Sequence, residues 1–333
     1  MNANGSSLLV VEGLKKYYPV RGGVFAAKIG DVRAVDGVSF DVKEGETLGL
    51  VGESGCGKST LGRTVMRLED PTAGRVFFEG ADMAHASKSE LFRLRRDVQA
   101  IFQDPYSSLN PRMTVGEIVR EPLLVHGIGT RAEQVEKVRA LFETVGLTGE
   151  MLDRYPHEFS GGQRQRIGIA RALALDPKLV IADEPVSALD VSVRSQVLNL
   201  MVKLQRERNL TYIFISHDLS VVEHVSDSIA IMYLGRIVEI GPADTVFDKP
   251  AHPYTRALME AIPVPDPDKR RQSAPIKGEA PSPIAPPPGC PFHPRCPYAI
   301  EACKQAIPPL EPVTPPNGAA RPHLAACIRK HEI

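Results

Sequence analysis

A glycine-rich run early in the chain has the spacing of a phosphate-binding loop. Residues 52–59 read Gly-Glu-Ser-Gly-Cys-Gly-Lys-Ser, after an apolar segment and before a segment of helical character. Such glycines let backbone N–H groups turn inward around phosphate oxygens, and a helix start adds positive partial charge. Lys58 is expected to reach the β- and γ-phosphates of a nucleotide, and the Ser59 hydroxyl to bind Mg²⁺. The residues expected to contact the nucleotide here are Gly52, Glu53, Ser54, Gly55, Cys56, Gly57, Lys58, Ser59 and Thr60.

Two adjacent acids follow a second apolar segment. Residues 179–182 are Leu-Val-Ile-Ala, the pattern of a parallel strand buried on both faces, and Asp183 and Glu184 come directly after them. Asp183 suits a Mg²⁺ contact through water, and Glu184 is placed to activate the attacking water as a general base. The pair alone would also fit a solvated acidic turn. The phosphate loop upstream favours the catalytic interpretation.

A third motif identifies a family resemblance. Residues 159–166, Phe-Ser-Gly-Gly-Gln-Arg-Gln-Arg, closely resemble the signature motif of ABC ATPases, with Phe159 in place of the usual leucine. A helix that begins after small residues can offer its first N–H groups to a phosphate. The resemblance implies that this phosphate belongs to ATP on a partner subunit. It assigns this contact to Ser160, Gly161, Gly162 and Gln163.

Further positions match the same family one at a time. Gln103, in Ile-Phe-Gln-Asp-Pro, resembles the Q-loop glutamine that senses Mg²⁺ and the attacking water. Asp190 ends a Ser-Ala-Leu-Asp run that resembles the D-loop at the dimer interface, and His217 resembles the switch histidine that contacts the γ-phosphate. Tyr18 resembles the aromatic residue that stacks on adenine, with Tyr17 as the alternative. Each residue alone would be unremarkable, but their order and spacing relative to the other motifs support these roles.

Composition narrows the class of protein. The 333 residues contain 40 Lys plus Arg and 40 Asp plus Glu, so the chain lacks the basic excess of a nucleic-acid binder. No apolar run approaches the ~18 residues that cross a bilayer, and the first residues do not resemble a signal peptide. We therefore expect a cytosolic chain that reaches a membrane only by docking to other subunits.

Alternating strand and helix patterns predict an α/β fold with a largely parallel sheet. The resemblance, over about residues 8–260, implies a P-loop NTPase (RecA-like) core with an antiparallel β subdomain and an inserted α-helical subdomain. We expect a nucleotide-binding domain at 1–262, with the helical subdomain at about 104–172, and a Pro/Cys-rich C-terminal extension at 263–333. The stretch 87–172 is interpreted as helical, and Asp190 is expected to cap the following helix.

Longer stretches narrow the resemblance to a subfamily. Residues 102–112, 182–194 and 252–255 resemble ATPases of dipeptide and oligopeptide importers, and the opening Leu-Lys-Lys-Tyr-Tyr-Pro-Val is closest to a dipeptide importer ATPase that pairs with a second ATPase. The resemblance implies a head-to-tail ATPase pair, two transmembrane permease subunits, an extracytoplasmic peptide-binding protein, and a place on the cytoplasmic face of the cell membrane. The same subfamily includes importers of nickel and other small solutes. The sequence does not decide between a homodimer and a heterodimer of ATPases. ABC ATPases of DNA repair or ribosomes usually carry two nucleotide domains or a long coiled coil, and this sequence has neither.

Four of the five cysteines lie in the C-terminal extension, in the order Cys290, Cys296, Cys303 and Cys327. Their spacing is not C-x-x-C and matches ordinary zinc knuckles poorly. Thiolates on a proline-rich segment could instead hold an iron–sulfur cluster, and the subfamily resemblance suggests [4Fe-4S]. Zinc, or free thiols and disulfides, remain the alternatives. Cys56, in the phosphate loop, is interpreted as a small filler residue.

Overall fold

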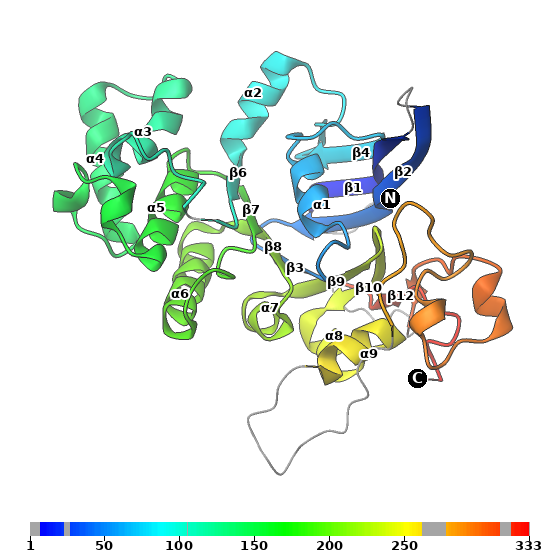
Figure 1. Cartoon of the computed structure of the whole chain (residues 1–333). Coiled ribbons are helices and arrows are strands. Elements are labelled where there is room, and N and C mark those ends of the chain that lie inside the picture. Colours follow the sequence, from blue (N-terminus) through cyan, green and yellow to red (C-terminus); the bar gives the residue numbers. More distant parts are fainter. Residues whose placement is uncertain (1–6, 23–26, 105, 262–277, 314–320, 333) are drawn as a thin grey trace, which may run out of the picture. The chain divides into compact units, whose positions relative to one another are not determined.

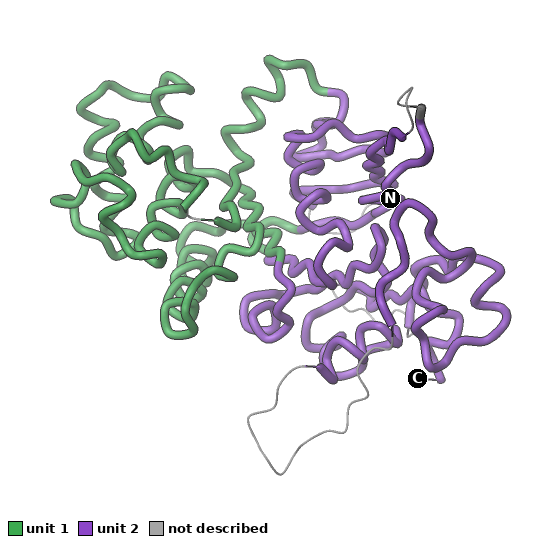
Figure 2. The backbone as a smooth tube through the Cα atoms, in the orientation of Figure 1, with its two compact units in different colours: residues 1–6, 43–46, 86–215 green, residues 7–42, 47–85, 216–333 purple. Residues whose placement is uncertain are grey.

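The computed structural model of the chain describes residues 7–22, 27–104, 106–261, 278–313 and 321–332 (Figure 1). Within them the chain forms two compact units (Figure 2). Unit 1 comprises residues 43–46 and 86–215, and unit 2 comprises residues 7–42, 47–85 and the chain from 216 onward. The expected domain boundary at 262/263 and the first prolines of the expected linker lie outside the described residues.

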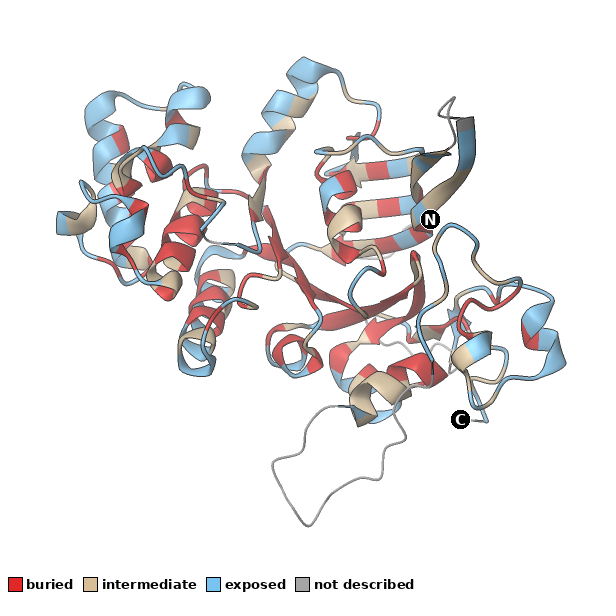
Figure 3. Cartoon of the chain, in the orientation of Figure 1, coloured by how far each residue is buried: buried red, intermediate tan, exposed pale blue. Residues whose placement is uncertain are grey.

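Unit 1 contains three parallel strands in the order β8–β7–β6. They are β6 (Val98–Ile101), β7 (Leu179–Asp183) and β8 (Thr211–Ser216). Every residue of β7 and β8 is buried, as the continuous apolar runs predict (Figure 3). Strand β6 lies inside the stretch interpreted as helical, and that interpretation was wrong there. Four residues are too few to display an alternating pattern, and the helix before β6 supplied the stronger signal.

The structure describes five α-helices in unit 1 (Figure 1). They are α2 (Lys88–Asp97), α3 (Val115–Val125), α4 (Arg131–Thr144), α5 (Gly161–Leu173) and α6 (Val191–Arg208), with 3₁₀ turns at Gly149–Met151 and Pro156–Glu158. Helices α2 to α5 each begin with a Ser or Thr whose hydroxyl accepts from the backbone three residues later, where a Glu or Gln reaches back. Helices α3, α4 and α5 contact one another.

Helix α6 begins where the sequence predicts but not in the expected manner. Asp190 occupies the N-cap position, yet its side chain makes no capping hydrogen bond. The expectation of a side-chain cap was therefore wrong, although the position of the helix start was right. The exposed Asp190 carboxylate is thus not used to hold its own helix.

Unit 2 contains a four-stranded sheet in the order β2–β1–β4–β5. The strands are β1 (Ser7–Gly22), β2 (Ala27–Lys43), β4 (Ala73–Phe78) and β5 (Ala81–Asp82). The β1–β4 and β4–β5 pairs are antiparallel. This sheet corresponds to the antiparallel subdomain that the resemblance implies.

A second set of strands in unit 2 runs in the order β3–β9–β10–β12–β11. Its members are β3 (Thr47–Val51), β9 (Ser228–Tyr233), β10 (Arg236–Pro242), β12 (Leu324–Ala325) and β11 (Glu311–Pro312). Strands β3 and β9 are parallel, and β9 and β10 form the predicted hairpin. Gly235 turns this hairpin at a φ of 79°, and a Cβ there would lie 2.7 Å from the Arg33 carbonyl oxygen.

Four helices complete unit 2, and the C-terminal extension packs onto it. The helices are α1 (Lys58–Val65), α7 (Leu219–Val225), α8 (Ala243–Asp248) and α9 (Pro253–Glu260). In the extension, 3₁₀ turns at His293–Arg295 and Glu301–Lys304 precede β11, and β12 pairs with β10. None of the helices among the described residues is long and apolar enough to cross a membrane.

A fully buried carboxylate ties the extension to the rest of unit 2. Glu239 on β10 accepts hydrogen bonds from the backbone N–H groups of Ala251 and His252 at 2.7 and 2.9 Å. Its Oε1 also lies 2.7 Å from Nε2 of His323, which precedes β12. A buried charge persists only when such partners surround it. Glu239 therefore joins β10, the start of α9 and the C-terminal segment at one point.

Replacing Glu239 by alanine is expected to destabilise the protein by about 3–5 kcal/mol, because the variant leaves buried donors without an acceptor. The measurement is the urea midpoint of the full chain. Glu311→Ala is the matched control, since Glu311 pairs with Lys330 while 56% exposed and should contribute about 0–1 kcal/mol. Equal midpoints for the two variants would contradict the anchoring role of Glu239.

Candidate functional site

The phosphate-loop sequence folds as predicted, between β3 and α1 of unit 2. Gly52 and Gly57 are required by close approaches: a Cβ would lie 2.1 Å from the Met232 carbonyl oxygen at Gly52 and 1.9 Å from the Ala34 carbonyl oxygen at Gly57. Gly57 also has a φ of 106° and is the N-cap of α1, with no side-chain capping bond. The first N–H groups of α1 therefore have no side-chain cap in this loop, as a phosphate cradle requires.

The Lys58 side chain folds back onto the phosphate loop. Its ammonium donates to the carbonyl oxygens of Gly52 at 2.8 Å and Glu53 at 3.0 Å, and the side chain is buried. These bonds hold the ammonium against the loop backbone, where a cation can pair with an anionic ligand. Burial raises the pKa of the Cys56 thiol, which keeps it protonated and fits the interpretation as a filler residue.

Tyr18 approaches the same helix, whereas Tyr17 points to other partners. The Tyr18 hydroxyl donates to Glu69 and also interacts with Thr60, and burial followed by the Glu69 contact raises its pKa to about 12. The Tyr17 hydroxyl instead donates to Asp36. Tyr18 is thus the tyrosine near the end of the phosphate loop, which favours it as the adenine contact.

Two of the three residues expected to take part in catalysis, Gln103 and Glu184, meet in unit 1, whereas the third, His217, belongs to unit 2. The Gln103 amide donates to Oε2 of Glu184 at 2.9 Å, although the two residues lie 81 positions apart. Glu184 follows β7 directly, and its N–H donates to the Ile215 carbonyl of β8 at 2.9 Å. Glu184 also has a φ of 47°, in the left-handed region that non-glycine residues avoid. Strain of this kind, held by neighbouring hydrogen bonds, is typical of functional positions.

The signature residues form the start of α5 in unit 1. The Ser160 hydroxyl accepts from the Gln163 N–H at 3.4 Å, and the Gln163 side chain accepts from the Ser160 N–H at 3.0 Å. Gly162 is required by packing, because a Cβ there would lie 2.2 Å from a methyl group of Val193 on α6. Ser160 itself is exposed at the helix start, where an anion could bind.

The remaining predicted residues lie at strand or helix ends. Asp183 is the last residue of β7 and is buried. His217 is exposed between β8 and α7 of unit 2. The structure thus brings Gln103 and Glu184 together, places Asp183 beside Glu184 in the chain, and gathers the loop residues and Tyr18 around α1.

Comparisons with known proteins bear on these motifs. A family model for the ABC transporter matches residues 35–187, and a second, for the C-terminal region of oligopeptide/dipeptide transporters, matches residues 238–303. The chain is 57% identical to a probable peptide ABC transporter ATP-binding protein of Sinorhizobium fredii, over 94% of this chain and 88% of that relative. The chain belongs to the ABC transporter family.

Other relatives place it among ATP-binding subunits. It is 53% identical to the oligopeptide transport ATP-binding protein AppF of Bacillus subtilis, over 98% of both chains. It is 54% identical to the dipeptide transport ATP-binding protein DppF of Haemophilus influenzae, over 91% of this chain and 93% of that one. The chain is therefore an ABC-type ATPase.

A solved structure supports the cassette fold. The dimeric post-hydrolysis state of an ATP-binding cassette bound to ADP and Pi matches with a TM-score of 0.63 and 28% identity. The match covers 71% of this chain and 98% of that chain. The mixed α/β cassette that the sequence predicted is therefore confirmed.

The four cysteines of the extension line one small cavity of about 20 Å³, together with Phe292 of the same segment. None of the four forms a disulfide in the structure. Burial, and to a smaller degree the neighbouring thiols, raises the pKa of Cys290 to about 11. Among the described residues no three His, Cys, Asp or Glu side chains are arranged to hold one metal ion. The donors fit a cluster in kind and number, but their present arrangement is that of packed thiols.

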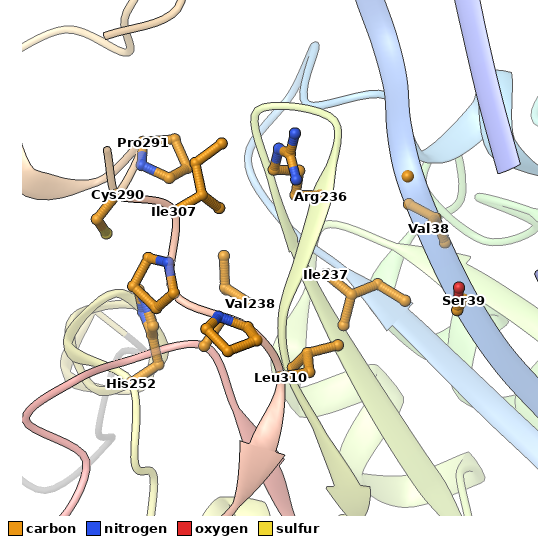
Figure 4. A pocket seen from close by; sticks show the side chains of 14 residues that line it. Val38, Ser39, Arg236, Ile237, Val238, His252, Cys290, Pro291, Ile307 and Leu310 are labelled. Carbon is orange, nitrogen blue, oxygen red and sulfur yellow. The ribbon is translucent and has the colours of Figure 1, made fainter. Parts of the chain in front are cut away.

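A larger cavity of about 400 Å³ lies between β2, β10 and the extension (Figure 4). Figure 4 shows Arg236, Ile237 and Val238 of β10 on one side, and Cys290 and Ile307 on the other. Of the described residues that line it, none belongs to the phosphate loop. The lining of this cavity is therefore separate from the predicted phosphate loop.

Proposed function

We propose that this ABC-type ATPase energises the uptake of di- and oligopeptides through partner permeases. The observation that carries the proposal is the match of residues 238–303 to the C-terminal region of oligopeptide/dipeptide transporters. Relatives at 53–57% identity carry peptide, oligopeptide or dipeptide transport in their names, and they align over most of this chain. The subunit would lie on the cytoplasmic face of the cell membrane, held there by its permeases.

The proposed chemistry gives each motif one part. Backbone N–H groups of residues 52–60 hold the phosphates, and Lys58 offsets the charge on the β- and γ-phosphates. Glu184 takes a proton from water while the water oxygen attacks the γ-phosphorus, and the bond to the β–γ bridging oxygen breaks to release ADP and phosphate. The Gln103 amide orients the Glu184 carboxylate, as their 2.9 Å contact supports. Ser59, Gln103 and Asp183 would hold Mg²⁺, as the motifs assign, and the ion would then supply positive charge against the phosphates.

The proposed working form is a head-to-tail pair of ATPases, with a second, different subunit as the partner. In this pair, Ser160, Gly161 and Gly162 bind the γ-phosphate held by the partner, and His217 contacts the one held in its own loop. The exposure of Ser160 at the start of α5 supports this role, because the start of a helix favours an anionic group such as a phosphate. ATP then acts as an adhesive between subunits, and hydrolysis releases them.

The helical layer of unit 1 is the proposed surface for the permeases. Leu124 and Val125, at the end of α3, are 62% and 59% exposed. A cavity of about 240 Å³ on the same layer is lined by residues including Arg120, Arg131 and Val135. Exposed apolar side chains are typical of surfaces that bind a protein partner.

We also propose that Cys290, Cys296, Cys303 and Cys327 hold a [4Fe-4S] cluster that stabilises the extension. Their common cavity supports the proposal, since four cysteines are the ligand set that a [4Fe-4S] cluster needs. Such a group would staple a segment too small to build a core of its own.

Affinity purification of the full chain from detergent-solubilised native membranes tests both proposals on one sample. We expect two permeases, a second ATPase and a peptide-binding protein to co-purify, with about four irons per chain. Cys303→Ser should lose the iron, whereas Cys56→Ser should keep it, because Cys56 lies in the phosphate loop.

Each other outcome has a definite meaning. Recovery with a nickel-binding protein would indicate that the transported substrate is a metal ion and not a peptide. Recovery with ribosomes or DNA would contradict the proposal that the protein serves a transporter. Iron-free protein from anaerobic preparation, or equal iron in Cys303→Ser and wild type, would overturn the cluster alone.

A further inference from the structure

Arg295 of the C-terminal extension contacts the phosphate loop. The Arg295 guanidinium donates to both oxygens of Glu53, at 2.9 and 3.0 Å, although 242 positions separate the two residues. A two-bond fork between guanidinium and carboxylate is the most directional of the common ion pairs. Glu53 is the second residue of the loop, next to Gly52.

The backbone N–H, the backbone carbonyl and the side-chain carboxylate of Glu53 all form hydrogen bonds. Its N–H donates to the Tyr254 hydroxyl at 2.9 Å, and its carbonyl oxygen accepts from Lys58 at 3.0 Å. Arg295 holds the side chain. The peptide that begins the phosphate cradle is therefore fixed from three directions, and two of the three partners lie outside the loop.

Arg295 is buried beside a cluster of aromatic side chains. The Arg295 side chain is only 8% exposed, and its guanidinium also donates to the Tyr233 hydroxyl at 3.4 Å. Tyr233, Tyr254 and Phe292 pack ring against ring, with centroids 4.7 to 5.3 Å apart. Phe292 and Arg295 belong to the same short turn of the extension. A buried aromatic cluster thus sets the position of the arginine.

We propose that Arg295 is a positioning residue of the phosphate loop, through which the folded extension keeps the loop ready for ATP. Arg295 does not touch the nucleotide; it acts through Glu53. A peptide held in its binding conformation loses less conformational freedom when the ligand arrives, so affinity rises without a new contact. The extension is then part of the ATP site of this chain. The inference rests on residues 52–60 being that site.

Arg295→Ala in the full chain tests the proposal. We expect the KM for ATP to rise by roughly threefold to tenfold while kcat stays within about twofold, because only preorganisation before binding is lost. Arg295→Lys should recover only part of the lost affinity, because lysine keeps the positive charge but its ammonium cannot form both hydrogen bonds of the guanidinium. Glu53→Gln, which leaves the extension intact, should show the same rise in KM. The double variant should lose no more than either single one, because both act on one contact.

Arg329→Ala is the matched control. Arg329 is also a partly buried arginine of the extension, but it donates to the Tyr298 carbonyl and to Glu332, away from the loop. We expect it to lower the urea midpoint and to leave the KM within about twofold. Equal KM values for Arg295→Ala and Arg329→Ala would show that Arg295 only anchors the extension. Additive losses for Glu53→Gln and Arg295→Ala would also overturn the proposal. Unchanged ATP binding in Lys58→Ala would instead overturn the site itself.

Discussion

Replacing Glu184 by glutamine is expected to lower steady-state ATP turnover by about 10²- to 10⁴-fold and to leave ATP binding within a few-fold of the wild type. The amide has nearly the shape of the carboxylate but cannot accept the proton of the attacking water. The strained φ of 47° and the N–H bond to Ile215 belong to the backbone, so the substitution leaves them in place. The variant therefore removes one chemical property from an otherwise unchanged site.

Two assays separate the steps. Phosphate release measures turnover, and equilibrium binding of a fluorescent ATP analogue measures affinity. Glu207→Gln is the control, because Glu207 is an acid on α6 of the same unit that is 57% exposed and pairs with Lys203 at the surface. If the proposed pairing holds, Glu184→Gln should also accumulate as an ATP-bound pair in size-exclusion chromatography. Turnover of Glu184→Gln within threefold of wild type would reject this residue as the general base.

The sequence predicted those parts of the fold whose signals are local. The phosphate loop has its required strand before it and helix after it, because the loop glycines and the apolar run of β3 are contiguous in the chain. Strand β7 ends at Asp183, and the β9–β10 hairpin turns at Gly235, again from short runs of residues. Ser160 begins α5 because Ser-x-x-Gln is a capping sequence by itself.

What the sequence did not predict depends on partners far away in the chain. Strand β6 is four residues long and is defined by its pairing with β7, not by a pattern of its own. Asp190 marks a helix start, but whether its side chain caps the helix depends on a rotamer that the sequence does not specify. Strands β1 and β2 are much longer than the apolar runs in the sequence that predict them. Pairing with neighbouring strands keeps polar residues in the extended conformation.

The same distinction applies to the site. Motif order was enough to name Gln103 and Glu184 separately, but only the structure gives the bond between them. The Arg295–Glu53 pair had no signal in the sequence, since neither residue belongs to a recognisable pattern with the other.

Replacing Lys58 by alanine is expected to weaken ATP binding by about tenfold to a hundredfold or more, because hydrogen bonds from a cation to phosphate oxygens contribute about 1.5–3 kcal/mol. The ammonium also donates to the carbonyl oxygens of Gly52 and Glu53, so its removal takes two hydrogen bonds from the loop backbone as well. Lys304→Ala is the control, since Lys304 forms an exposed pair with Glu301. Binding is measured with the same fluorescent ATP analogue, and an affinity equal to that of the control would contradict the phosphate cradle.

The structure distinguishes the two effects of losing Lys58. In Lys58→Ala the Tyr254 hydroxyl and the Arg295 fork still hold Glu53, so the loop backbone should keep its shape and the loss should report the missing charge. In Lys58→Ala combined with Arg295→Ala, the loop has lost both its charge and its outer support. If the loop shape and the charge contribute separately, the double variant should bind ATP more weakly than Lys58→Ala by the factor that Arg295→Ala shows alone. If Lys58 itself were what holds the loop, the second substitution would add nothing, and the support of the cradle would lie within the loop and not in the extension.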